Sequence, residues 1–174
     1  DYIQNKKTFL DVLSLFNLFV KDNKPIIFCN AHHEAFEFVD KNSNLYNLDH
    51  HHDLSYNNDQ RVRAQNKLIE AANWIHALQL HKKLNYYFWV GNFNSSFDFK
   101  DNPHSITANF KYFNFSHEIK DLYKNKYDKI VVCESKRHSD NCFILYEVLK
   151  TITKSLNKKV KILKTKNSQG YLKV

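Results

Sequence analysis

The sequence predicts an α/β fold, with a mainly parallel, doubly wound sheet and helices on both faces. Two observations lead to this prediction. Short apolar runs that are typical of strands alternate with segments of helical periodicity along the whole chain, as in β-α-β units. The clearest of these runs are apolar almost throughout, which is typical of strands that are buried on both faces of a parallel sheet.

The first half of the chain is expected to begin with two helices and two strands. Residues 8–20 have apolar side chains at helical spacing, and Pro25 follows this helix. Residues 25–29 indicate a buried strand, residues 33–41 suit a second helix, and residues 45–48 form the next strand.

The remaining chain continues the alternation, with loops where Gly, Pro, Asn and Ser gather. The expected elements are a loop at 57–59, a helix over 68–84, a strand at 86–90, a loop at 91–105, an edge strand at 106–115, a short helix at 117–126, a strand at 129–133, an amphipathic helix at 141–156 and a strand at 160–163. The 174 residues contain no internal repeat and no linker, so we expect a single domain over 1–174, with 166–174 as a loosely held tail.

The net charge of +8 and the pI near 9.3 fit an acidic partner such as nucleic acid. Lysine is nevertheless spread along the whole chain, and this favours a general bias in composition over a binding surface. The two glycines exclude Gly-rich phosphate loops. The chain has no apolar run of about 18 residues or more, so we expect no transmembrane helix and no membrane partner.

The three cysteines, Cys29, Cys133 and Cys142, lack the spacing of a metal site. Their odd number, without a visible signal peptide, predicts a reducing compartment and a cytoplasmic protein. Cys29 and Cys133 each end an apolar run, so we expect buried structural thiols rather than nucleophiles. A serine nucleophile is not indicated either, because the chain has no G-x-S-x-G elbow.

The strongest indication of function is Asp49-x-His51-x-Asp53, which directly follows a predicted strand. Alternate residues of an extended backbone face the same way, so all three side chains can point at one metal ion. Carboxylate oxygens and an imidazole nitrogen suit Mn²⁺, Zn²⁺ or Fe²⁺. A polar loop is the simpler alternative, but crowding these groups is costly unless a cation is bound.

Two further segments follow neighbouring strands and are expected at the same edge of the sheet. In the first, His32 or His33 can complete the metal sphere, although this segment also suits a helix start with Asn30 as its cap. In the second, Glu134 and His138 are candidate catalytic residues, with a solvated loop as the alternative.

Four weaker candidates lie in a helix and a loop. Trp74 is expected in the core, and Asn73 can face the site. The carboxylates of Asp98 and Asp101 lie in a glycine- and proline-punctuated loop, and we expect them at the surface.

A strand that ends in a histidine, followed by a strand that ends in Asp-x-His-x-Asp, resembles the arginase/deacetylase (ureohydrolase) superfamily of binuclear metallohydrolases. The resemblance is nearest to its peptide-arginase-like branch. It rests on the segments at residues 30–35, 48–54 and 73–75. It covers residues 26–90 well and residues 128–156 loosely.

The resemblance implies a compact arginase-like α/β domain and a hydrolase with one or two Mn²⁺ ions. Carried over by position, the metal ligands are His32, Asp49, His51 and Asp53. A metal-bound hydroxide would attack the carbon of a guanidinium or an amide in a small-molecule or peptide substrate.

The chain departs from the superfamily in one respect that bears on catalysis. Two more ligands are expected from a later Asp-x-Asp, and none occurs after residue 53. The segment with Asp98 and Asp101, which carries Lys100 where the second aspartate belongs, and Glu134 are the two candidate substitutes. Two alternatives to the hydrolase follow: a catalytically degenerate module that binds a ligand or protein, and a basic nucleic-acid-associated protein. The sequence does not predict the oligomeric state.

Overall fold

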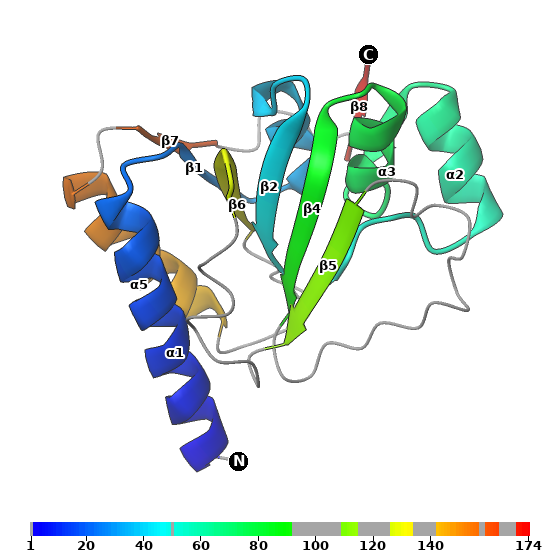
Figure 1. Ribbon diagram of the computed structural model, residues 1–174. Coiled ribbons are helices and arrows are strands. Elements are labelled where there is room, and N and C mark those ends of the chain that lie inside the picture. Colours follow the sequence, from blue (N-terminus) through cyan, green and yellow to red (C-terminus); the bar gives the residue numbers. More distant parts are fainter. Residues whose placement is uncertain are drawn as a thin grey trace.

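The computed structural model describes residues 2–49, 51–91, 109–114, 126–133, 142–156, 159–163 and 170–174 (Figure 1). At its centre is a six-stranded sheet in the order β5-β4-β2-β6-β1-β7, and all neighbouring strands run parallel. The strands are β1 (Ile26–Cys29), β2 (Ser43–Leu48), β4 (Leu84–Gly91), β5 (Asn109–Asn114), β6 (Lys129–Cys133) and β7 (Val160–Ile162). An α/β fold with a mainly parallel sheet is confirmed.

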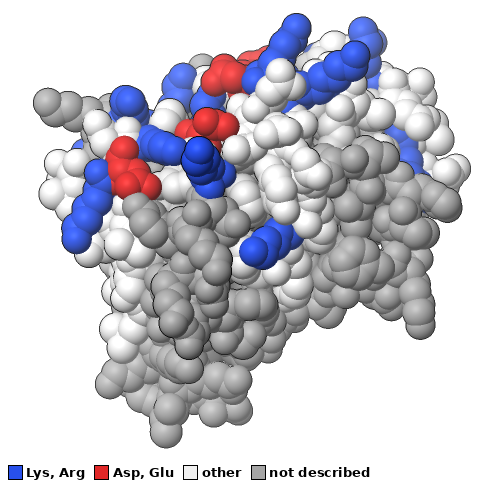
Figure 2. Space-filling view, in the orientation of Figure 1, with Lys and Arg blue, Asp and Glu red and all other residues white. Residues whose placement is uncertain are grey.

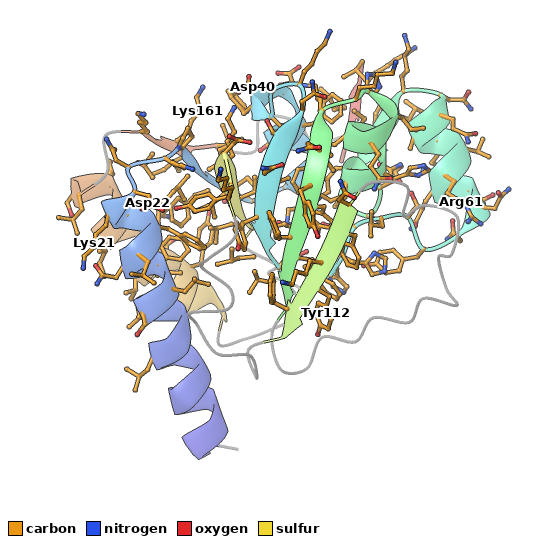
Figure 3. All side chains as sticks on the ribbon, in the orientation of Figure 1. Lys21, Asp22, Asp40, Arg61, Tyr112 and Lys161 are labelled. Atoms are coloured by element: carbon orange, nitrogen blue, oxygen red, sulfur yellow. The ribbon has the colours of Figure 1, made fainter. Side chains whose placement is uncertain are left out.

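Helices cover both faces of the sheet. One face packs against α1 (Tyr2–Lys21) and α5 (Cys142–Leu156), and the other packs against η1 (His32–Phe38), α2 (Asn58–Gln65) and α3 (Trp74–Leu80). Strand residues alternate between the two cores, as a pleated strand requires: in β1, Phe28 faces the α1/α5 side and Cys29 faces the other side. Tyr112 of β5 stacks on Trp89 of β4 at 4.4 Å between ring centroids (Figure 3).

The strand order decides where the candidate site lies. Because β6 lies between β1 and β2, the carboxyl ends of these three strands are neighbours at one edge of the sheet. The segments that follow β1 and β2 therefore begin at the same edge, on either side of the end of β6, as the parallel arrangement led us to expect.

The structure corrects the expected helix over 68–84. Its start is a short strand, β3 (Leu68–Glu70), and the helix α3 begins at Trp74. Asn73 breaks the pattern: its amide group donates to the carbonyls of Gln60 and Leu68 and accepts from the backbone N–H of Glu70. These bonds fix a turn where apolar spacing alone suggests a continuous helix.

Other expected elements differ in their type. The expected helix at 33–41 is a 3₁₀ helix, η1, and the expected loop at 57–59 is the start of α2. Asn57 is the N-cap of α2, and its side chain accepts a hydrogen bond from the N–H of Gln60 (2.9 Å).

The expected tail is also corrected in part. Within it, β8 (Tyr171–Lys173) pairs antiparallel with β3, so these residues are held in a small second sheet. The edge strand expected at 106–115 is present as β5. The loop expected at 91–105 and the helix expected at 117–126 lie almost entirely outside the described residues.

Candidate metal centre

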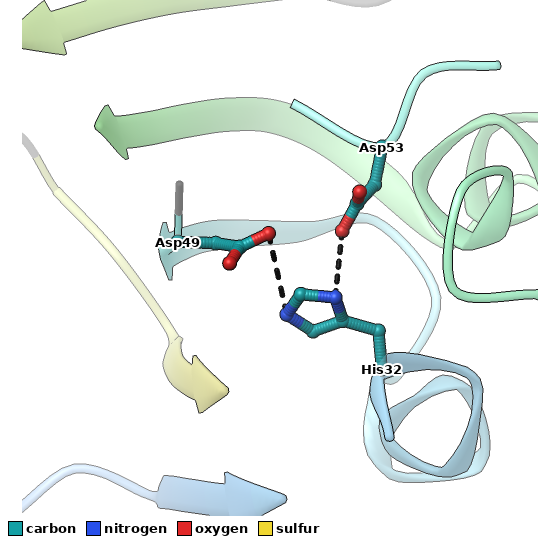
Figure 4. Close-up of side chains that lie close together, drawn as sticks. All are labelled: His32, Asp49 and Asp53. Carbon is teal, nitrogen blue, oxygen red and sulfur yellow. Dashed lines mark ion pairs between the residues drawn. The ribbon is translucent and has the colours of Figure 1, made fainter. Parts of the chain in front are cut away.

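Three of the predicted metal ligands lie together at the carboxyl edge of the sheet. His32 is the first residue of η1, Asp49 directly follows β2, and Asp53 lies in the loop beyond it. Their potential ligand atoms lie within 4.8 Å of one another, and all three residues are buried. Figure 4 shows the imidazole ring of His32 between the two carboxylates.

The His32 ring uses its two nitrogens differently. Nδ1 lies 2.8 Å from Asp53 Oδ2, a hydrogen-bond distance, whereas Nε2 lies 3.6 Å from Asp49 Oδ2. Nε2 is buried and has no hydrogen-bond partner. A separation of 3.6 Å is close to the roughly 3.4 Å between two ligands of one tetrahedral ion with bonds of about 2.1 Å. The gap between His32 and Asp49 therefore fits a metal ion.

Trp74 is a second partner of this group. Its indole Nε1 donates a hydrogen bond of 2.8 Å to Asp53 Oδ2, and its ring stacks on the His32 ring at 5.4 Å and 16°. Asp53 Oδ2 therefore meets two N–H donors, one from His32 and one from Trp74. Carboxylates and aromatic rings that orient a ligating histidine are typical of metal sites.

The charges of the group favour a cation. Burial alone would lower the pKa of His32, but Asp49 and Asp53 outweigh it and raise this pKa to about 10. Burial raises the pKa of Asp53 to about 7, against the opposing effect of its donors His32 and Trp74. Two buried carboxylates beside one imidazole carry more negative charge than a single proton balances. A divalent ion beside a neutral imidazole would make the group neutral.

The loop that presents Asp53 has an unusual backbone. Asp53 has φ of 55° and Ser55 has φ of 67°, both in the left-handed region that non-glycine residues rarely adopt. The start of α3 and the turn before it hold this conformation, because Ile75 N–H donates to the carbonyl of Asp53 and Ser55 N–H donates to the carbonyl of Ala72. Backbone hydrogen bonds thus hold this loop from the α3 side of the site.

Strand β4 holds the same loop from the sheet. Trp89 Nε1 donates to the carbonyl of Asp49 (2.9 Å), and the Tyr87 hydroxyl donates to the carbonyl of His52 (3.0 Å). The Tyr87 hydroxyl in turn accepts from the amide of Asn47 in β2 (3.1 Å). Buried side chains thus fix the backbone on both sides of the Asp49–Asp53 turn, and this preorganises the carboxylates.

His51 does not join the group of three. It is half-buried, and its ring lies edge-on to the Tyr56 ring at 6.3 Å. The role of His51 as a ligand therefore stays a prediction. Asp53 has a left-handed φ of 55°, so this segment does not continue as a regular strand with strictly alternating side chains. Asp49 and Asp53 meet through a loop, and alternation along a strand is not the cause.

His33 and His52 each lie next to a member of the group in the sequence. Both are buried, and their surroundings differ. His33 has both ring nitrogens buried without a hydrogen-bond partner, and burial lowers its pKa. His52 accepts a hydrogen bond at Nδ1 from Leu54 N–H (3.0 Å), and burial, followed by His51, lowers its pKa to about 4. Of His32 and His33, the two alternatives from the sequence, the structure brings His32 to the carboxylates.

The remaining predictions divide into two groups. Asn73, considered for the site, is fully buried and holds the turn before α3. Trp74 was expected only in the core, and its bond to Asp53 was missed because nothing in the spacing of an apolar helix face indicates where an indole N–H points. Glu134 and His138, the candidate catalytic residues, and the loop of Asp98 and Asp101 lie outside the described residues.

Comparisons of the chain with protein-family models, curated proteins and solved structures found no match. Among the described helices, none combines the length and apolar character needed to cross a membrane. The class that fold and site define is therefore a parallel α/β protein with a buried His/Asp/Asp group that can hold a metal ion.

Proposed function

We propose that the protein is a metal-dependent hydrolase that cleaves a C–N bond with a metal-activated water. The observation that carries this proposal is the buried group of His32, Asp49 and Asp53 at the carboxyl edge of a parallel sheet. Open α/β sheets bind their ligands at this edge. The three residues are not a solvated cluster of surface charges, because they are between 3% and 8% exposed.

The donor set supports a hard or borderline divalent ion. Two carboxylates and one imidazole suit Mn²⁺, Zn²⁺ or Fe²⁺, and the arginase resemblance favours Mn²⁺. Such an ion lowers the pKa of a bound water and supplies a hydroxide nucleophile near neutral pH. In this arrangement Asp53 and Trp74 keep the His32 ring in place, and Trp89 and Tyr87 keep the Asp49 loop in place.

The substrate class follows from the resemblance and remains part of the proposal. A guanidinium or an amide, in a small molecule or a peptide, would present its carbon to the hydroxide. Glu134 and His138 are the proposed residues for orienting the substrate and moving protons, because they follow β6 in the sequence and β6 ends at this edge. The arginase-like variant of the fold belongs to this proposal too.

A second candidate is a catalytically degenerate relative that binds a metal or a ligand without turnover. A specific observation favours it: among the described residues, one group with metal-type geometry occurs, and its three members would form one site. The sequence also lacks an Asp-x-Asp after residue 53. A binuclear reaction would need a second set of ligands, and His51 and Glu134 are the residues proposed for it.

The nucleic-acid alternative gains little from the basic charge. Figure 2 shows Lys and Arg side chains along the upper edge of the molecule, with acidic side chains between them. Several lysines bind the protein itself: Lys83 donates to the carbonyls of Phe36 and Val39, and Lys129 donates to Asp40 and to the carbonyl of Phe38. These ammonium groups stabilise the end of η1, which leaves fewer of them for phosphates.

The test combines metal analysis with a substrate panel. Protein purified without chelator is analysed for bound metal, dialysed, and titrated with Mn²⁺. Release of urea or ammonia is then followed with arginine, arginine-containing peptides and simple amides. We expect Mn²⁺ binding with turnover of at least one substrate. Binding without turnover of any of them would favour the degenerate module. No binding of Mn²⁺, and none of Zn²⁺ or Fe²⁺ titrated in the same way, would refute the hydrolase and the metal-binding form of the module.

A further inference from the structure

Two cysteines lie directly beside each other at the edge of the sheet that carries His32, Asp49 and Asp53. These three candidate ligands are called the metal group below. Cys29 ends β1, Cys133 ends β6, and the two residues are register partners in adjacent parallel strands. Both are free thiols, and both side chains belong to the core on the η1/α3 face. Burial, followed by the interaction with the Cys29 thiol, raises the pKa of Cys133 well above its ordinary range.

The pair has a geometry that a disulfide can span. Adjacent strands lie about 4.8 Å apart, and disulfides join Cα atoms that are roughly 4.4–6.8 Å apart. The two side chains lie on the same face because they are partners in register. Cys133 is half-buried, whereas Cys29 is fully buried, so reagents reach Cys133 first.

The pair is also coupled in space to the metal group. In the strand order β2-β6-β1, Leu48 and Phe28 both pair with Val132, so the next residues along, Asp49, Cys133 and Cys29, continue as one row across the sheet. His32 follows Cys29 by three residues, at the start of η1. A change in the spacing of β1 and β6 at this row therefore moves the backbone that carries both His32 and Asp49.

We propose that Cys29 and Cys133 form a reversible disulfide that weakens metal binding at His32, Asp49 and Asp53. The effect on metal binding rests on the proposed function, whereas the formation of the disulfide does not. A disulfide brings the two Cβ atoms to about 3.8 Å, whereas adjacent strands lie about 4.8 Å apart, so its formation changes the spacing and tilt of the ends of β1 and β6. The metal group is assembled from these strand ends and is deformed as a result.

The oxidant is a low-molecular-weight disulfide such as oxidised glutathione. Cys133 first loses its proton to solvent, and because its pKa is raised this step makes the reaction slow at neutral pH. The thiolate then attacks one sulfur of this disulfide, whose S–S bond breaks, and one glutathione thiolate leaves and takes up a proton from solvent. The Cys29 thiolate then attacks Cys133 Sγ, which forms the Cys29–Cys133 bond and releases the second glutathione, protonated by the hydrogen of Cys29. The two cysteines lose two electrons and two protons, and the glutathione disulfide gains them.

The linkage is reciprocal. If the disulfide lowers the affinity for metal, bound metal must disfavour the disulfide by the same factor. Saturation with Mn²⁺ is therefore expected to shift the thiol–disulfide equilibrium toward the dithiol. A disulfide that is only structural, with no connection to the metal group, would not respond to the metal.

The experiment uses the full chain with Cys142→Ser, which removes the third cysteine. The protein is incubated with oxidised glutathione, with and without Mn²⁺, and analysed by intact mass and peptide mapping. It is then titrated with Mn²⁺ before and after reduction. The matched controls, each in the Cys142→Ser background, are Cys133→Ser, which removes the accessible thiol, and Cys29→Ala, which removes the buried one.

We expect the loss of two hydrogens, a peptide linked through Cys29 and Cys133, and a fall in Mn²⁺ affinity of about tenfold or more that reduction reverses. The Cys133→Ser control should keep its affinity after the same treatment, and Cys29→Ala should stop at a glutathione adduct. A stable adduct on Cys133 without closure would overturn the inference, and so would closure without a change in affinity. If the reduced protein binds no metal, the proposed function and the coupling both fail, and the mass alone decides whether the disulfide forms.

Discussion

The indole Nε1 of Trp74 donates a hydrogen bond to Asp53 Oδ2 at 2.8 Å, and both residues are buried. This bond joins the first residue of α3 to the loop after β2. Trp74 also stacks on His32, so one side chain positions two members of the metal group. A tryptophan that would otherwise be only a core residue thereby becomes a positioning residue for the site.

Replacement of this indole tests its role. Trp74→Phe keeps an aromatic ring beside His32 but removes the donor to Asp53, so we expect Mn²⁺ affinity to fall about tenfold to a hundredfold. Titration calorimetry measures the effect. Leu78→Val, a buried change in the same helix, is the control for lost packing and should leave the affinity unchanged. Equal affinities for Trp74→Phe and the wild type would show that Asp53 needs no second donor.

The pKa shifts predict how the metal-free protein responds to pH. His32 has its folded pKa raised to about 10 from 6.5, so its contribution to stability is complete below pH 6.5 and is lost as pH rises toward 10. The pKa of Asp53 is raised from 3.8 to about 7, so this carboxyl also lowers stability as pH rises, but over that lower range of pH. We therefore expect the Tm of metal-free protein to fall between about pH 7 and pH 8.5, and calorimetry or circular dichroism measures it.

Bound metal should reverse this trend. A divalent ion takes the place of the proton between His32 and Asp49, so its affinity rises with pH and its stabilisation grows as the metal-free protein weakens. The window above pH 7 avoids the buried His52, whose lowered pKa affects stability only at lower pH. A Tm of the metal-free protein that rises over this window would contradict the charge assignment at His32.

His51 offers a test that separates the structure from the pattern in the sequence. The Asp-x-His-x-Asp spacing predicts that His51→Ala abolishes metal binding. Because His51 lies outside the group of three, we expect this variant to keep one ion with an affinity within about threefold of the wild type. Metal analysis of the dialysed variant measures this directly, and complete loss of metal would place His51 in the same coordination sphere.

The lysines around η1 have a structural role that mutation can measure. Lys83 Nζ donates to the carbonyls of Phe36 (3.2 Å) and Val39 (2.6 Å) and lies over the Phe36 ring. We expect Lys83→Met to lower the free energy of unfolding by about 1–3 kcal/mol, because both carbonyls lose the ammonium donor and Phe36 keeps only the backbone N–H of Val39 (3.4 Å). Chemical denaturation measures the loss. Lys82→Met, an exposed neighbour, is the control and should have little effect.

Much of the fold was predictable because apolar runs indicate buried parallel strands directly. The strand expected at 129–133 was placed correctly, and its position between β1 and β2 follows from pairing that no local pattern reveals. The helix expected over 68–84 failed because the side chain of Asn73 competes for backbone hydrogen bonds at a place where the apolar spacing continues.

The site was predictable in part for a related reason. Ligand-type residues at strand ends indicate a site, and His32, Asp49 and Asp53 do meet. Their geometry depends on a left-handed residue at Asp53 and on the Trp74 donor, which are features of tertiary packing. The sequence therefore indicated which residue types gather at this edge, whereas the loop decides which of these side chains meet.

Direct titration of the wild-type protein with Mn²⁺, beside Asp49→Asn and Asp59→Asn, tests the metal centre most directly. Asp49 is a buried member of the group, whereas Asp59 is an exposed acid in the first turn of α2. We expect the wild type and Asp59→Asn to bind at least one ion per chain with equal affinity, and Asp49→Asn to lose about a hundredfold or more. Equal binding by all three proteins would show that His32, Asp49 and Asp53 do not hold the metal.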